Sequence, residues 1–210
     1  MKKASVLMII GSTLLLSLFI FPLWNIELLA PQYPKGLGMH IFIDGLEGYT
    51  EHDLMNIDGL NHYIGMQTLP EKGDMWEFTT FPIIIAIMAL IGILIGIVGF
   101  FKHSTYKWFM GWFVVMSVLG ILGMYDFNQW LVDYGSNLDP HAIIKVVDDF
   151  GNPMSYKPPL LGTKDILNFT AISLPGVGGY LMGAGMFLIF ISFFIGRKAA
   201  KKENLSLAFH

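Results

Sequence analysis

The sequence predicts an all-α membrane protein with four transmembrane helices and two outward-facing segments that form a small, partly β extracytoplasmic cap. Three observations lead to this fold class: long apolar runs, few charged residues, and an uneven distribution of basic and acidic residues. Charged residues make up 14% of the 210 residues, whereas soluble domains usually carry about 25%. The mean hydropathy of +0.57 points the same way.

Four apolar runs are long enough to cross the hydrocarbon as helices, which takes about 20 residues each. They cover residues 4–24, 81–101, 108–125 and about 174–196, and none contains a charged side chain. Pro82 suits the first turn of the second helix. The predicted domains are therefore 1–24, 25–80, 81–101, 102–107, 108–125, 126–173, 174–196 and 197–210, with spans alternating with the links and outer segments.

The basic residues predict the orientation. Short stretches beside the spans hold eight of the 13 lysines and arginines: Lys2, Lys3, Lys102, Lys107, Arg197, Lys198, Lys201 and Lys202. Because basic residues near span ends mark the cytoplasmic side, we expect both termini and the 102–107 link in the cytoplasm of a bacterium, with the protein in its inner membrane. Every acidic residue except Glu203 lies in the segments expected outside.

The first apolar run also has the basic start and apolar core of a signal peptide, so cleavage is the alternative to a retained helix. The region around residues 28–30 lacks the small-x-small pattern of a cleavage site, and the run is long for a signal, which favours retention. In the later spans, Gly92 with Gly96 and Gly179 with Gly183 form two GxxxG motifs. Small residues at this spacing predict close helix contacts for the second and fourth spans, within this chain or with a partner.

The outer segments carry weaker local signals. The stretch "GMHIFID" predicts a short strand with His40 and Phe42 on one face, and Thr50 suits the start of a short helix. The stretch "LNHYIGM", residues 60–66, is helical or extended; if helical, His62 and Met66 share one face. The stretch "AIIKVVDDFGNPM", residues 142–154, predicts a strand and a turn. We expect the two outer segments to pack together.

Metal chemistry, if present, depends on methionine and histidine because the chain has no cysteine. Thioether and imidazole suit Cu(I), and the two most compact pairs are Met39 with His40 and His62 with Met66. The side chains that could orient an imidazole of these pairs are Asp44, Asn61 and Tyr63. The alternative is that these residues only pack, since 13 methionines are spread over the chain. Spacing alone favours packing.

Several function classes lack support. No phosphate loop, serine elbow or zinc-protease motif is present, and no span carries the charges of a pump, so we expect no enzyme. The formal net charge of −3 gives no reason to expect nucleic acid as a partner. A haem-bearing electron-transfer subunit would need ligands, yet no histidine lies within a span.

With "FPLW" at the end of the first helix, "APQYPKGL" after it and "LNHYIGM" downstream, the chain resembles a family of bacterial four-span membrane proteins associated with nitrous oxide reductase gene clusters. The resemblance spans the whole chain. It implies an accessory role, namely copper delivery to, or maturation of, an extracytoplasmic copper enzyme. Membrane lipid, such an enzyme and other membrane subunits are the partners expected. The alternative is a structural or scaffold subunit of a membrane complex.

Overall fold

The computed structural model describes residues 1–144, 155–166 and 168–208. The chain divides into two compact units. The first, which we call the helical unit, comprises Met1–Phe21, Thr79–Ile121 and Val177–His210. The second, the sheet unit, comprises Pro22–Phe78 and Leu122–Gly176. The chain therefore passes between the units four times.

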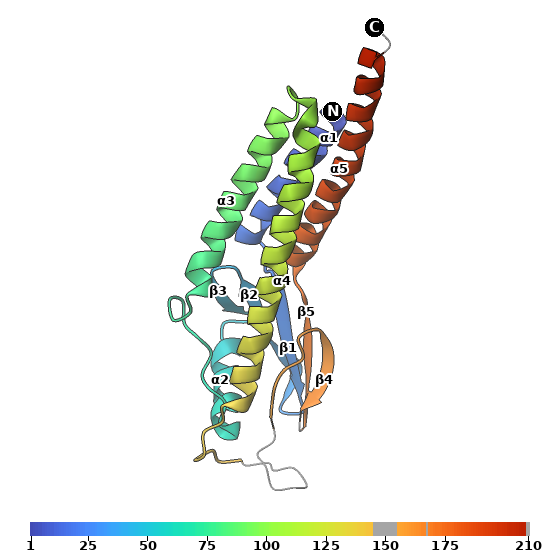
Figure 1. The fold of residues 1–210 in the computed structure, drawn as a ribbon. Coiled ribbons are helices and arrows are strands. Elements are labelled where there is room, and N and C mark those ends of the chain that lie inside the picture. The colour runs from blue at the N-terminus through green and yellow to red at the C-terminus, as the bar shows by residue number, and fades with distance from the viewer. Residues whose placement is uncertain (145–154, 167, 209–210) are drawn as a thin grey trace. The chain divides into compact units, whose positions relative to one another are not determined.

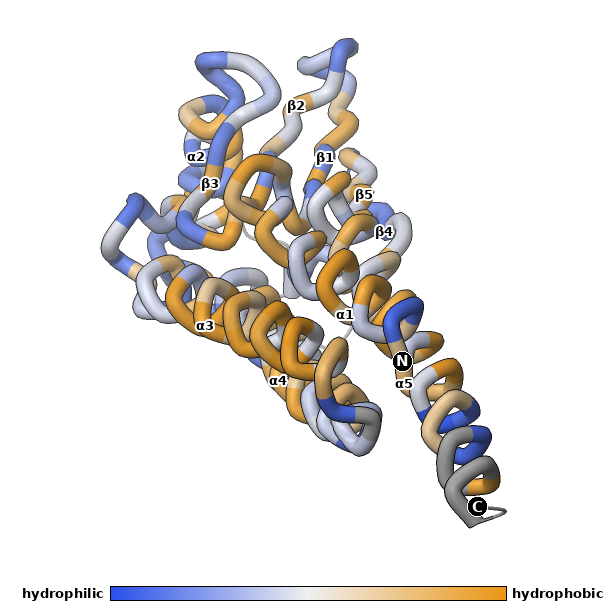
Figure 2. Tube along the Cα trace, turned by 90° about the horizontal axis from the view of Figure 1, so that it is seen from above, coloured by the Kyte–Doolittle hydropathy of each residue, from blue (hydrophilic) through white to orange (hydrophobic). Residues whose placement is uncertain are grey.

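The helical unit is built from helices that are long and apolar enough to cross a membrane, so the protein is an integral membrane protein. Its elements are α1 (Lys2–Leu14) continued by the 3-10 helix η1 (Leu15–Phe19), α3 (Glu77–Val98), the 3-10 turn η2 (His103–Thr105), the first part of α4 (Tyr106–Ser136), and α5 (Val177–Ala208) (Figure 1). Figure 2 shows these helices as hydrophobic along most of their length. Hydrophilic segments lie at the N-terminus, at the turn between α3 and α4, and on α5 toward the C-terminus.

The first span is shorter than predicted. Its helix ends at Phe19 rather than Trp24, because Pro22 restrains the preceding residue to extended backbone, and Trp24 already begins a strand. Thirteen α-helical residues and five 3-10 residues still cover roughly 30 Å, since the 3-10 form rises about 2.0 Å per residue. The hydrocarbon thickness is therefore just matched.

The other three helices overrun the predicted spans. The helix α3 begins at Glu77, so Pro82 lies inside the helix rather than in its first turn. The helix α4 continues to Ser136, well past the apolar run, and α5 continues past the predicted end at residue 196. Residues 174 and 175 belong to a strand and not to the fourth span. Hydropathy located the spans but did not define where the helices end.

The helices of this unit approach closely where glycines face a neighbour. A Cβ added at Gly11 of α1 would lie 2.6 Å from the carbonyl oxygen of Gly185 on α5. Gly92 and Gly96 of α3 face Ser12 and Ile9 of α1, which confirms the first GxxxG as a contact. At Gly183 the described residues give no contact within this chain, because a Cβ there would meet no atom within 4 Å; a contact with a partner stays a prediction. Gly185 instead makes the close approach of α5.

The sheet unit makes the protein a mixed α/β structure, so the predicted all-α class is wrong, whereas the four spans and the β content of the outer segments are found as predicted. Its elements are β1 (Trp24–Ala30), β2 (Tyr33–Phe42), β3 (Gly45–Gly48), α2 (Asp53–Ile64), the end of α4, β4 (Gly162–Ile166) and β5 (Phe169–Pro175). All four strand pairs are antiparallel, and the order across the five-stranded sheet is β3-β2-β1-β5-β4.

The two outer segments meet in this sheet, which confirms that they pack together. The pairing of β1 with β5 runs from Trp24 opposite Pro175 to Leu29 opposite Thr170. The indole Nε1 of Trp24 donates to Ser173 Oγ at 2.8 Å, and both side chains are buried. On one face of the sheet, α2 and the end of α4 enclose an apolar core that includes Ile26, Ile57 and Leu131. The strand and turn expected at residues 142–154 lie largely outside the described residues.

Candidate functional site

The stretch "LNHYIGM" is the end of α2 and the turn that follows it. The helix ends at Ile64, and Gly65 has a φ of 78°, the left-handed conformation that closes many helices. The amide of Met66 donates to the carbonyl of Asn61 at 2.9 Å. Because the chain has left the helix at Gly65, Met66 does not continue the helical face that carries His62.

Asn61 is a buried bridge within the sheet unit. Its side-chain Nδ2 donates to the hydroxyl of Tyr134 on α4 and, at 3.5 Å, to Asp58 Oδ1. The same Asp58 oxygen accepts the amide of Leu69 at 2.6 Å. These bonds join α2, the chain after it and α4, so Asn61 holds the fold together. Neither of these two bonds reaches an imidazole, so the role of Asn61 in orienting one stays a prediction.

The second outer segment docks on this turn. The amide of Asp139 donates to the carbonyl of Gly65 at 2.8 Å, and the amide of Ile144 donates to the carbonyl of Tyr63 at 2.9 Å. A Cβ at position 65 would lie 2.7 Å from the Cβ of Ala142. "LNHYIGM" is therefore the place where the two outer segments are tied together.

An open pocket of about 510 Å³ lies beside the turn, lined by residues 65–67 and 137–140. Met66 is half-buried, lines this pocket and also packs against the apolar clusters of the sheet unit. His62 is exposed and does not line the pocket. Met66 thus shares the pocket with Asn137 and Asp139 rather than with His62.

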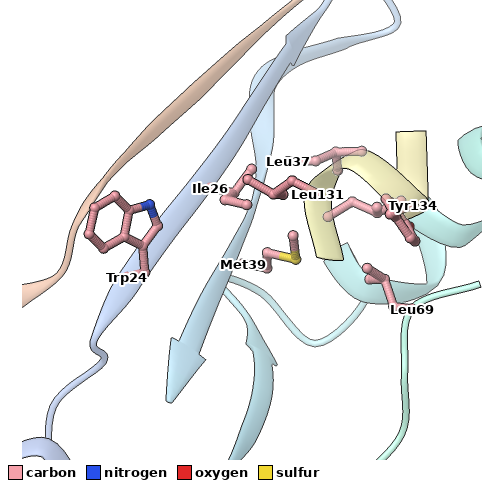
Figure 3. Close-up of a cluster of buried hydrophobic side chains, with 8 residues drawn as sticks. Trp24, Ile26, Leu37, Met39, Leu69, Leu131 and Tyr134 are labelled. Atoms are coloured by element: carbon pink, nitrogen blue, oxygen red, sulfur yellow. The ribbon is translucent and has the colours of Figure 1, made fainter. Parts of the chain in front are cut away.

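Met39 and His40 lie on opposite faces of β2, as successive residues of a strand do. Met39 is 5% exposed and packs among Ile26 and Leu131 (Figure 3). Both side chains of this pair cannot bind one ion unless β2 loses its strand conformation here. Met39 fills the core, which matches the alternative expected for the methionines.

His40 has surroundings that suit an oriented imidazole. Its Nδ1 lies 2.7 Å from Asn25 Oδ1 on the neighbouring strand, and its ring lies against the ring of Tyr49, tilted by 33° with centroids 4.4 Å apart. An amide oxygen only accepts, so Nδ1 is the donor if this contact is a hydrogen bond to Oδ1. Metal-binding imidazoles commonly have such a partner on the other ring nitrogen. Asn25 opposes His40 in the register, but the sequence did not reveal this because β1 was not predicted.

Of the other two expected partners, Asp44 is engaged with a lysine, whereas Tyr63 lies beside the His62 ring. Asp44 forms an exposed ion pair with Lys72 at 2.7 Å. Tyr63 is 51% exposed, and its ring meets the ring of His62 edge-on with centroids 6.3 Å apart. Among the described residues, no group of three or more histidine, aspartate or glutamate side chains is placed to hold a metal ion.

Asp53 is a buried carboxylate that the sequence did not single out beyond its place near a helix start. It accepts hydrogen bonds from the hydroxyl of Thr50 and, at 3.0 Å, from the amide of Gly38 on β2. Burial opposes its charge, but these bonds, a backbone bond from Thr50 and the nearby His52 outweigh burial and lower the pKa of Asp53 below its ordinary value of 3.8. The charged carboxylate thus fastens the start of α2 to the sheet.

Comparisons of the chain with protein-family models, with characterised proteins and with solved structures give no match. The assignment of a function therefore depends on the geometry described above.

Proposed function

We propose that this protein is a non-catalytic membrane accessory protein whose sheet unit lies outside the cytoplasm and docks a partner protein. The observation that carries the proposal is an apolar surface patch formed by Tyr63, Ile143 and Ile144, which are 51%, 67% and 46% exposed. The backbone bond between Ile144 and Tyr63 holds this patch together. Large apolar side chains gathered on a folded surface are typical of protein interaction sites.

The orientation in this proposal follows from charge. The N-terminus, the turn between α3 and α4, and the C-terminal part of α5 lie at one end of the helical unit (Figure 1) and carry the basic residues near the spans. Placing that end in the cytoplasm satisfies the positive-inside rule. The chain connections to the sheet unit leave from the other ends of the helices, which supports an extracytoplasmic sheet unit in a bacterial inner membrane.

A photo-crosslinking amino acid tests the docking patch. Placed at Ile143 in the full-length protein, expressed in its native host, it should capture one specific partner. The matched control is Leu161, which is 63% exposed on the same unit but not part of the patch. Equal capture from both positions, or none from Ile143, would contradict the proposal. The resemblance to the nitrous oxide reductase cluster proteins makes an extracytoplasmic copper enzyme the first partner to look for.

Copper handling is the second candidate, and the oriented His40 imidazole is the observation that favours it. Cu(I) titration of the purified protein should show weaker binding in His40→Ala and in His62→Ala/Met66→Ala than in wild type. The control is His52→Ala/Met55→Ala, which removes an exposed histidine and methionine from the start of α2. Equal affinity in wild type and all variants would exclude these residues as ligands and leave docking as the function.

A further inference from the structure

At the basic end of the helical unit, the apolar part of α5 is followed by basic residues that share one face of the helix. From Val177 to Gly196 the helix covers roughly 30 Å, which matches the hydrocarbon of a bilayer. Arg197 therefore begins the headgroup region. Lys201 follows four residues later and lies on the same side of the helix.

The start of α4 is held against this section of α5. A Cβ added at Gly196 would lie 2.8 Å from the Cβ of Tyr106, and the ring centroids of Tyr106 and Phe193 are 6.0 Å apart. Because Tyr106 is fixed there, the neighbouring Ser104 and Lys107 are brought to the same face of α5 as Arg197.

These residues form an open pocket of about 540 Å³. Its polar lining consists of Ser104, Tyr106, Lys107, Arg197 and Lys201, and the small side chain of Ala200 leaves room between them. Among the side chains that the structure describes, Lys107, Arg197 and Lys201 have no ion pair, since Lys72 with Asp44 is the ion pair found there. Three cations with no described counter-ion, gathered in a concave site, favour binding of an anion.

We propose that this pocket binds the phosphodiester headgroup of an anionic glycerophospholipid. The guanidinium of Arg197 offers a fork that fits phosphate oxygens, the two lysines add charge, and the hydroxyls of Ser104 and Tyr106 can donate. The pocket lies at headgroup depth. Trp108 and Phe194, 69% and 48% exposed on the same two helices, offer apolar surface for the acyl chains. Inorganic phosphate has the same headgroup chemistry but cannot use that surface.

Native mass spectrometry of the full-length protein in a neutral detergent tests this site, with phosphatidylglycerol and phosphatidylcholine as probes. Wild type should retain phosphatidylglycerol on the order of tenfold better than phosphatidylcholine. The variant Lys107→Gln/Arg197→Gln/Lys201→Gln should lose this preference. The control Lys102→Gln/Lys198→Gln/Lys202→Gln removes the same charge from the same end but not from the pocket, and should keep the preference.

If the two triple variants lose the preference for phosphatidylglycerol equally, the effect is one of general charge, and the pocket is not the binding site. Displacement of the lipid by inorganic phosphate at matched concentration would also overturn the lipid assignment, leaving a free anion as the ligand. Should the pocket variant fail to fold by circular dichroism, Arg197→Lys decides instead. This variant keeps the positive charge but loses the paired N–H donors of the guanidinium, so it should reduce the preference for phosphatidylglycerol in part. An unchanged preference would contradict the site.

Discussion

Two helix pairs, one in each unit, are joined in different ways: α1 and α5 of the helical unit approach with bare backbone at glycines, whereas α2 and α4 in the sheet unit are joined by polar side chains. Gly11 meets Gly185 between α1 and α5, whereas Asn61 meets Tyr134 between α2 and α4. The difference follows from the surroundings expected for each unit. Helices in lipid gain little from burying apolar side chains and associate by close packing, whereas a unit in water uses an apolar core fixed by buried hydrogen bonds.

The largest effect is expected from Gly11→Leu. The new side chain would overlap the carbonyl of Gly185 and the side chain of Ile189, and two packed helices cannot relax to admit it. The free energy of unfolding in detergent should fall by about 3 kcal/mol. The control Gly183→Ala, which meets no atom within 4 Å, should change it by less than about 0.5 kcal/mol. Similar losses from both would mean that backbone contact does not hold the helices.

Gly65→Ala should have the next largest effect. It combines a left-handed backbone with a clash against Ala142, and we expect a loss of about 2 to 3 kcal/mol in denaturant titration. Gly73→Ala separates the two causes, because Gly73 has a φ of 109° and open space around it. The loss of unfolding free energy in Gly65→Ala minus that in Gly73→Ala measures how much the docking of the second outer segment on Gly65 contributes to stability. No difference would show that docking adds nothing to stability.

The buried pair of Asn61 and Tyr134 should contribute less. Either Asn61→Ala or Tyr134→Phe leaves a buried polar group unpaired and should cost about 2 kcal/mol. The double variant should cost less than the sum of the single losses, because the same bond between Asn61 and Tyr134 is lost in each single variant. Strict additivity in this double-mutant cycle would rule out the bond as a link between α2 and α4.

The smallest effect concerns pH. The pKa of Asp53 is lowered on folding, so the carboxylate stabilises the fold fully above the unfolded pKa, near 3.8, and this contribution is lost as the pH falls through the folded pKa. Asp53→Asn should lower the free energy of unfolding by about 1 kcal/mol at pH 7. The difference in free energy of unfolding between Asp53→Asn and wild type should become smaller below about pH 4. A gap that stays constant with pH would show that the carboxylate's charge is not involved.

The spans could be predicted from sequence because a run of about 20 apolar residues has few other solutions. The sheet could not, because its central pairing joins residues far apart: Trp24 and Ser173 are separated by 149 positions. The strand β1 begins at the end of the first apolar run, and β5 ends at the start of the fourth apolar run. The prediction therefore assigned Trp24 of β1 and residues 174 and 175 of β5 to membrane spans.

The candidate metal residues show the same limit. Strand alternation implied that Met39 and His40 face opposite ways, but only the sheet register placed Asn25 beside His40. For His62 and Met66, the helical spacing was correct, but Gly65 ended the helix between them. A glycine between the two residues was the available signal, since glycine often terminates helices in this way.

The strand order also bears on how the protein is made. The central strand β1 emerges early in synthesis, yet its second neighbour β5 follows α2, α3 and α4. Until β5 arrives, β1 forms the edge of a three-stranded sheet with an open row of amides and carbonyls. Such edges pair readily with other chains. The nascent chain therefore passes through a stage in which the unpaired edge of β1 must be kept from other chains, and delays in elongation or insertion would favour aggregation through β1.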